Sequence, residues 1–144
     1  MTGVSATEFA PNAGTSRAMI WMVLARMRGA DVEGGESPWY QKAMAWAVDS
    51  GISDGADPNG LITREQLVTM LYRLAGEPGE RADLSGYPDA GGVSPWAADA
   101  MRWAVAVGLI RGDENRQIMP RTACSRAQTA AMIMRYEAMT AEAS

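Results

Sequence analysis

Three arginines stand where a guanidinium group could hold an anion. Arg17, Arg64 and Arg126 each follow a serine or threonine directly, and each opens an apolar run with helical spacing. A positive charge in the first turn of a helix opposes the helix dipole and costs a few tenths to about 1 kcal/mol. A helix N-terminus with a bidentate guanidinium is a good carboxylate site, which would compensate that cost. Alternatively, each arginine pairs with an Asp or Glu of a neighbouring unit and holds the fold together.

The residues around these arginines predict where long helices start. Thr63 and Ser125 are natural N-caps, and a glutamine follows three residues later, at Gln66 and Gln128, which completes a capping box. In the first copy Met19 occupies the glutamine position, so that box is open. We therefore expect long helices over residues 17–27, 64–75 and 126–138.

A second unit occurs twice, as "SPWYQKAMAWAVDSGISDG" and "SPWAADAMRWAVAVGLIRG", and the two copies align without a gap. Ser-Pro predicts a helix start, with serine as the N-cap and proline in the first turn. Gly51 and Gly108, each followed by a hydrophobic residue, predict the end of that helix. Each copy therefore predicts one short helix before a long one.

The order of these units predicts an all-α protein with five main helices, because no strand pattern of useful length is present. One long helix comes first, and a short helix, a loop and a long helix then follow twice. The segment "GEPGERADLSGYPDAGG" has the composition of a linker between units. We divide the chain into residues 1–30, 31–78 and 79–144, the second half of a first repeat and two complete repeats, all in one compact domain.

Composition excludes several functions. The chain has 144 residues, is 47% hydrophobic and carries a net charge of −4. This balance argues against nucleic acid and against anionic membrane surfaces as partners. No apolar stretch is long enough to cross a membrane, so no membrane insertion is expected. The N-terminus does not resemble a signal peptide, so either the chain begins inside a longer protein or it stays in the cytoplasm.

Catalytic and metal-binding chemistry is not expected. The chain has no histidine, no paired carboxylates at repeated positions and no phosphate loop, so we predict no enzyme activity, no cofactor and no metal site. The segment "GADPNGLITREQ" lacks the carboxylates that an EF-hand needs at its first and last positions. Cys124, the single cysteine, is interpreted as a small buried hydrophobic residue.

Taken in order, these motifs resemble S-layer homology repeats. The third unit contains "YPD", "WA", "GLIRG", "IMP" and "CSRAQ", the middle unit contains "PWY", "GISDG", "ADP" and "ITREQ", and the first keeps "FAP" and "TSRAM". The family's motif glutamate is replaced in all three copies, by Met19, Gln66 and Gln128.

The resemblance implies a pseudo-threefold bundle of three long central helices with two short helices as prongs. It implies that grooves between units bind a pyruvylated secondary cell-wall polysaccharide. The module would then be a non-catalytic anchor at the cell surface of a Gram-positive-type bacterium, as part of a longer secreted protein. The ligand-binding residues that it implies are Arg17, Arg64, Arg126, Trp39, Trp96, Gly55 and Gly112.

The missing first short helix supports an alternative interpretation. Without it at most two of three grooves are complete, and apolar surface stays on the bundle. Such a surface fits a helical protein-interaction or oligomerisation module, a homodimer, or a cover formed by residues 1–15. We expect Trp46 and Trp103 in the core, Trp21 in the core or at the bundle interface, and most methionines as core filling.

Overall fold

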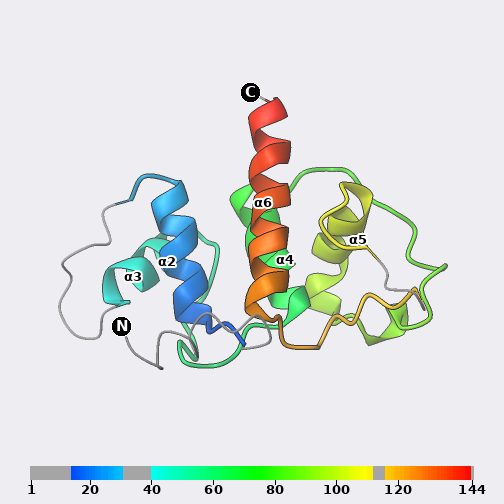
Figure 1. Ribbon diagram of the computed structural model, residues 1–144, viewed down its shortest axis with the longest axis horizontal. Helices are drawn as coiled ribbons and strands as arrows, with labels where there is room; N and C mark the ends of the chain where they lie inside the picture. Colours follow the sequence, from blue (N-terminus) through cyan, green and yellow to red (C-terminus); the bar gives the residue numbers. More distant parts are fainter. Residues whose placement is uncertain (1–13, 31–39, 112–115, 144) are drawn as a thin grey trace.

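The computed structural model describes residues 14–30, 40–111 and 116–143 (Figure 1). Its three long helices are α2 (Arg17–Met27), α4 (Arg64–Leu74) and α6 (Arg126–Ala143), and all three begin on the same side of the molecule. The two short helices are α3 (Gln41–Asp49) and α5 (Ala98–Ala106). The prediction of an all-α fold with five main helices is confirmed, since the described residues contain no strand.

Each short helix packs on the long helix of the unit before it. Helix α3 lies against α2, and α5 lies against α4 (Figure 1). Aromatic pairs mark both contacts: the ring centroids of Trp21 and Tyr40 are 6.3 Å apart, and those of Tyr72 and Trp103 are 5.7 Å apart. Because each short helix belongs to one unit and packs on the long helix of the unit before it, it joins two successive units.

The predicted helix ends are present. Gln66 N–H donates to Thr63 Oγ1 at 3.3 Å, and Thr63 N–H donates back to Gln66 Oε1 at 2.9 Å. Ser125 and Gln128 form the same two bonds. Gly51 has φ +74°, and the amide of the next residue donates to Ala47 O at 2.9 Å, which closes the helix end as predicted.

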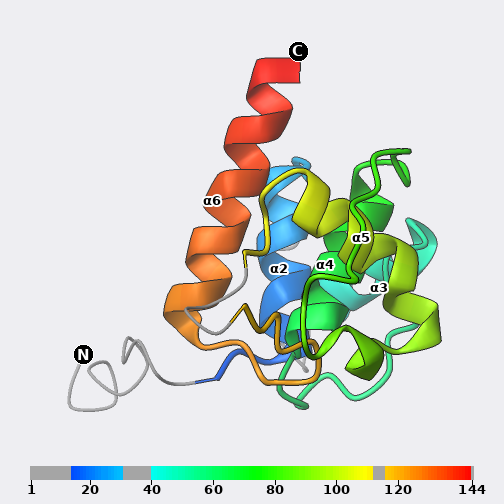
Figure 2. The same cartoon turned by 90° about the vertical axis from the view of Figure 1, so that its right-hand side faces the viewer.

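One helix end and one helix start differ from the prediction. Helix α6 runs to Ala143 rather than to about residue 138, because no glycine follows to end it and alanine, glutamate and methionine favour helix. Figure 2 shows its last turns extending beyond the rest of the molecule. The third unit's Ser-Pro start forms a 3-10 turn, η2 (Pro95–Ala97), before α5, and a second 3-10 turn, η1 (Ala90–Gly92), precedes it. Ser94 does not cap this helix with its side chain, because its hydroxyl donates to Glu65 instead.

The segments that lead into the long helices pair with one another. Three isolated bridges join Ser16 to Leu61, Thr63 to Ala123, and Ser125 to Gly14. In each bridge the N-cap of one long helix meets the residue two positions before the N-cap of another. The three helix N-termini are therefore held in a pseudo-threefold ring.

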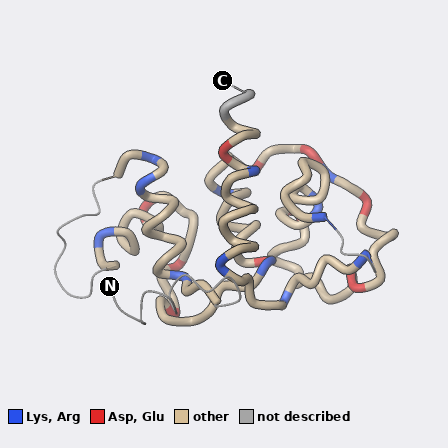
Figure 3. The backbone as a smooth tube through the Cα atoms, viewed as in Figure 1, with Lys and Arg blue, Asp and Glu red and all other residues tan. Residues whose placement is uncertain are grey.

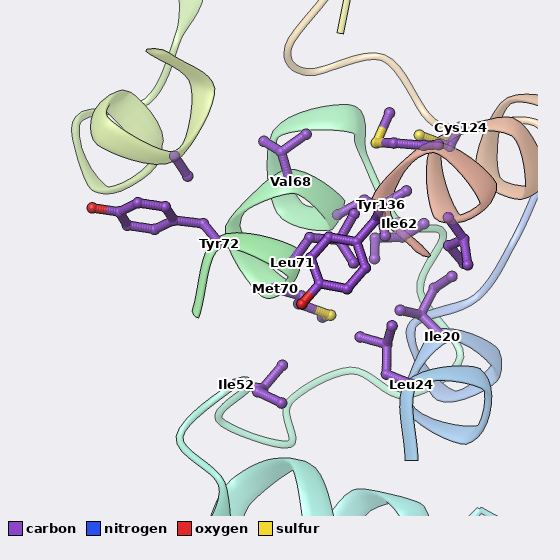
Figure 4. Packing of buried hydrophobic residues seen from close by; sticks show 14 of the residues in the cluster. Ile20, Leu24, Ile52, Ile62, Val68, Met70, Leu71, Tyr72, Cys124 and Tyr136 are labelled. Atoms are coloured by element: carbon purple, nitrogen blue, oxygen red, sulfur yellow. The ribbon is translucent and has the colours of Figure 1, made fainter. Parts of the chain in front are cut away.

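Side chains from α2, α4 and α6 meet in one core (Figure 4). Ile20 and Leu24 come from α2, Leu71 comes from α4 and Tyr136 comes from α6, and all four are buried. Trp21 and Trp103 are fully buried, as expected, whereas Trp46 is half-buried. Cys124 is also buried, as expected.

Most methionines of the described helices fill the core, with one clear exception. Met22, Met70, Met101 and Met132 are buried, but Met134 on α6 is 68% exposed.

Among the helices that the structure describes, none is both long and apolar enough to span a bilayer.

Candidate functional site

The first amides of α2 already have partners within the chain. The N–H groups of Arg17 and Ala18 donate to the carbonyls of Gly60 and Pro58, both at 3.0 Å. The next amide donates to Ser16 Oγ at 3.2 Å. These donors are therefore not available to a ligand.

Helix α4 repeats this arrangement with the loop of the third unit. Arg64 N–H donates to Thr122 O at 3.0 Å, and Glu65 N–H donates to Pro120 O at 2.8 Å. The expectation that helix N–H groups form a carboxylate site is thus wrong for α2 and α4. The physical reason is that an extended loop of the following unit crosses each helix start and supplies two carbonyl oxygens, which also offset the arginine charge.

The guanidinium groups bind the same loops. Arg17 Nη1 donates to Ala56 O at 3.1 Å, and Arg64 Nε donates to Ile118 O at 2.9 Å. These two carbonyls occupy equivalent positions, two residues before the motif proline. Arg17 also lies 3.9 Å from Asp57, but that carboxylate is 68% exposed, so water screens the pair. The main partners are therefore backbone carbonyls rather than the carboxylates of the alternative expectation.

Arg64 and Arg17 differ in their access to solvent. Arg64 is 8% exposed, and its described contacts hold the loop of the third unit against α4. The Arg17 side chain is 22% exposed and lines an open groove. The ligand role of Arg64 stays a prediction, and its burial favours a role in holding the units together.

The groove beside Arg17 lies between α2, α4 and the turn after α3, and we call it the Arg17 groove. It has a volume of about 380 Å³. It brings Arg17 together with Trp96, another predicted ligand residue, although the two come from the first and third units. The lining residues are Arg17, Ile52, Ser53, Asp54, Gln66, Thr69, Met70, Arg73 and Trp96.

The chemistry of this groove suits a polar ligand with an apolar face. Trp96 is 54% exposed, so much of its indole is open to solvent. Arg73 supplies a second guanidinium, whose Nη1 donates to Ile52 O at 3.2 Å. Since a guanidinium has five N–H donors, Arg17 and Arg73 keep donors beyond these contacts. Figure 3 shows Lys and Arg near the starts of the long helices.

Arg73 was not predicted from the sequence, although the repeats contain a signal for it. An arginine recurs nine residues after each motif arginine, at Arg26, Arg73 and Arg135. Arg135 Nη1 donates to Leu109 O at 3.4 Å, and Leu109 follows its turn glycine as Ile52 does. The second arginine of a unit thus binds the turn of its own unit, as Arg73 and Arg135 do. The motif arginine binds the loop of the following unit, as Arg17 and Arg64 do.

Among the described residues, Gly55, Arg64 and Arg126 were also predicted to bind ligand, but they do not line the Arg17 groove. Gly55 has φ +77°, and a Cβ at this position would lie 3.0 Å from a methyl of Val48, so the turn itself requires glycine. Trp39 and Gly112 lie outside the described residues.

Trp96 is positioned by a buried carboxylate on α4. Glu65 is 4% exposed and accepts from Ser94 N–H at 2.9 Å and from Ser94 Oγ at 2.7 Å. Ser94 immediately precedes the 3-10 turn that carries Trp96. This contact fixes the prong of the third unit against the long helix of the second.

A second groove lies between α2 and α6, beside Arg126, and we call it the Arg126 groove. Its volume is about 400 Å³. Apart from Arg126 and two threonines, the described residues that line it are apolar and include no tryptophan. Arg126 Nε is buried and has no hydrogen-bond partner among the described residues. The lining residues are Thr15, Met19, Ile20, Val23, Arg126, Thr129, Ala130, Ile133 and Met134.

Comparison with known proteins identifies relatives of this chain. A model of the S-layer homology domain matches residues 30–68 and 86–130. An endoglucanase of Bacillus sp. (strain KSM-635) is 30% identical over 92% of the chain, and an amylopullulanase of Thermoanaerobacterium thermosulfurigenes is 28% identical over 91%. A surface-layer 125 kDa protein of Lysinibacillus sphaericus is 38% identical over 53% of the chain. The chain spans only 7% to 16% of the length of these relatives.

A solved structure shares the fold. An undecaheme cytochrome from the S-layer of Carboxydothermus ferrireducens superimposes with a TM-score of 0.50 at 22% identity. The similarity covers 99% of this chain and 24% of the cytochrome. At this identity the likeness concerns the helical architecture.

Proposed function

Since this chain belongs to the S-layer homology family, we propose that it attaches a longer protein to the bacterial cell wall by binding a pyruvylated secondary wall polysaccharide in the Arg17 groove. Modules of this family are non-catalytic, occur in surface-layer and wall-associated proteins, and bind cell-wall polysaccharides. The wall that we propose is of the Gram-positive type.

One observation carries the proposal: the Arg17 groove places two guanidinium groups and an exposed indole around one opening. A pyruvyl ketal presents a carboxylate on a sugar, and a guanidinium binds carboxylates through paired N–H donors. The apolar C–H face of the sugar suits the face of Trp96, since an aromatic side chain offers a broad apolar surface. Arg17 and Arg73 supply the charge, and Trp96 supplies the platform.

The electrostatics of the chain agree with a local site of this kind. The net charge is −4, so the surface as a whole does not attract anions. Two arginines and one carboxylate, Asp54, line the groove, which leaves a small area of net positive charge on this acidic surface. Such an area favours one bound carboxylate over a long polyanion, for which an extended basic surface is needed.

Binding to purified wall polymer tests the proposal. We expect the chain to bind the pyruvylated polymer, and we expect Arg17→Gln and Trp96→Ala to weaken binding strongly while helical circular dichroism is retained. Loss of a charge-assisted contact costs about 1.5–3 kcal/mol, or roughly 10- to 150-fold in affinity. Arg121→Gln is the matched control, because Arg121 is exposed and does not line the groove.

Chemical removal of pyruvate separates this proposal from its alternatives. Binding should fall with depyruvylation to the same extent as with Arg17→Gln, and the two changes together should cost little more than either alone. Equal binding before and after depyruvylation would contradict the pyruvyl-carboxylate assignment. A chain that binds neither polymer but forms a stable homodimer or binds another protein would be an interaction module instead.

A further inference from the structure

The Arg17 groove has one acidic side chain among its described lining residues. Asp54 lies in the turn after α3 and lines the same opening as Arg17 and Arg73. A carboxylate near two guanidinium groups weakens their attraction for an anion, because like charges repel. Binding of a ligand carboxylate alone therefore gives no reason for an acidic residue at this position.

The turn that carries Asp54 does not require an acidic residue. In each of the two units, the two amides after the turn glycine donate to one carbonyl. This carbonyl is Ala47 O, at 2.9 and 3.3 Å, in the second unit and Ala104 O, at 2.8 and 3.2 Å, in the third. At the position of Asp54 the third unit has Arg111. The same turn thus forms with a side chain of opposite charge.

Asp54 is oriented by the turn and can still accept from a ligand. Its Oδ1 accepts from the N–H of Ala56 at 2.9 Å, which holds the carboxylate in place. The residue is exposed, and an ionised carboxylate has about four acceptor positions, so most of its capacity remains. It has no hydrogen to donate. A ligand carboxylate therefore offers Asp54 nothing, whereas a ligand hydroxyl can donate to it.

The neighbouring polar side chains of the groove are left with donors. Gln66 Oε1 accepts from the N–H of Thr63 at 2.9 Å, so its NH₂ group remains as a donor. Ser53 Oγ accepts from the N–H of Gly55 at 3.2 Å, which leaves its hydroxyl proton to donate. The described lining thus combines several donors with one ionised acceptor, Asp54. This combination matches a ligand that presents both a carboxylate and a hydroxyl.

We propose that Asp54 accepts a hydrogen bond from a free hydroxyl of the sugar whose pyruvyl carboxylate binds Arg17 and Arg73. This inference rests on the proposed function and narrows its ligand to a monoanionic sugar with an unsubstituted hydroxyl near the acid group. A sugar on which that hydroxyl is substituted leaves Asp54 without a donor and close to a like charge. Asp54 is therefore a specificity-determining residue of the groove.

O-methylation of the purified pyruvylated polymer, with its carboxylates kept free, tests this directly, because a methyl ether can accept a hydrogen bond but cannot donate one. We expect the unaltered chain to bind the O-methylated polymer at least about tenfold more weakly than the unmodified polymer. Asp54→Asn keeps an oxygen for the bond to Ala56 but replaces the other oxygen with NH₂. It should bind the unmodified polymer at least about tenfold more weakly than the unaltered chain does. O-methylation should then weaken its binding by less than about threefold, because the bond is already lost.

Asp57→Asn is the matched control, since it removes a carboxylate near Arg17 that does not line the groove. Asp57 Oδ2 lies 3.9 Å from Arg17 Nη1, so this variant should bind the unmodified polymer no more weakly than the unaltered chain does. Helical circular dichroism and Tm should be unchanged in Asp54→Asn, because the bond to the turn is kept.

Two results would overturn the assignment of Asp54. The first is that Asp54→Asn binds the unmodified polymer as tightly as the unaltered chain does, or more tightly, so that the carboxylate acts only as a charge. The second is that O-methylation weakens the variant and the unaltered chain equally. Both results leave the proposed function intact, because the unaltered chain still binds the pyruvylated polymer. Absence of that binding would contradict the proposed function and this inference together.

Discussion

Replacement of Glu65 by glutamine tests how the third unit is held against the second. Glu65 is buried on α4, and both its carboxylate oxygens accept from Ser94, one from the amide and one from the hydroxyl. Glutamine keeps the shape of the side chain but has only one acceptor oxygen. Its NH₂ group would face the Ser94 hydroxyl, which can turn and accept from it, so both contacts persist but neither involves a charged group.

The expected cost follows from these two bonds. A hydrogen bond to a charged group contributes about 1.5–3 kcal/mol and a neutral one about 0.5–1.5 kcal/mol, so loss of the charge at two bonds should lower the free energy of unfolding by about 1–3 kcal/mol. Ser94→Ala removes only the hydroxyl bond and should cost a similar amount. Because both changes weaken the same contact between Glu65 and Ser94, the double variant should be less destabilised than the sum of the two. A domain with about 5–15 kcal/mol of stability should remain folded.

Urea unfolding monitored by circular dichroism measures these costs, and thermal unfolding should show a decrease in Tm of about 3–12 °C for Glu65→Gln. Trp96 provides a local readout, because Ser94 immediately precedes its 3-10 turn. Gln66→Ala serves as a neighbouring comparison that breaks a capping box without touching Ser94. If Glu65→Gln and the unaltered chain unfold within about 0.5 kcal/mol of each other, the buried contact does not hold the prong and the reasoning is wrong.

Three further perturbations have defined outcomes. Burial raises the pKa of the Cys124 thiol above its usual value of 9.0. The neutral thiol therefore contributes fully to stability below pH 9.0, and this contribution is lost as the pH rises through the pKa of the folded state. Urea unfolding at a series of pH values should show this loss relative to Cys124→Ala. Gly108 has φ +86°, so Gly108→Ala should cost about 1–3 kcal/mol by thermal unfolding, whereas Gly79→Ala, without a positive φ, should not. Asp89 accepts from the amides of Ile118 and the next residue, so Asp89→Ala should cost about 1.5–3 kcal/mol in urea unfolding.

Local sequence signals predicted the helices well, because the forces that start and end a helix act over a few residues. The capping boxes at Thr63 and Ser125 and the turn glycines Gly51 and Gly108 are all formed as expected. The end of α6 was misjudged because no local signal stops it. The resemblance to S-layer homology repeats then implied the pseudo-threefold arrangement of the long helices.

The partners of the arginines could not be predicted in the same way. Backbone carbonyls are present at every residue, so a sequence contains no sign of which carbonyl will meet Arg17 or Arg64. Two functional side chains could nevertheless have been found by comparing the repeats. Arg73 recurs at a fixed distance from the motif arginine, and Glu65 replaces an alanine that the other two long helices have at the same position.

Repetition of a sequence motif does not by itself repeat a binding site. At equivalent helix positions the Arg17 groove has Gln66 and Met70, whereas the Arg126 groove has Met19 and Val23. Where the second repeat has Gln66, the first has Met19, which supplies neither a capping bond nor a polar group to the groove wall. This one difference therefore alters both the helix start and the groove. The same arginine therefore faces a polar opening with an exposed indole in one place and an apolar hollow in the other. Since loop carbonyls hold the guanidinium groups of both Arg17 and Arg64, the capacity to bind a carboxylate depends on what the neighbouring unit adds. In the described residues, Trp96 and Arg73 are the groups added beside Arg17.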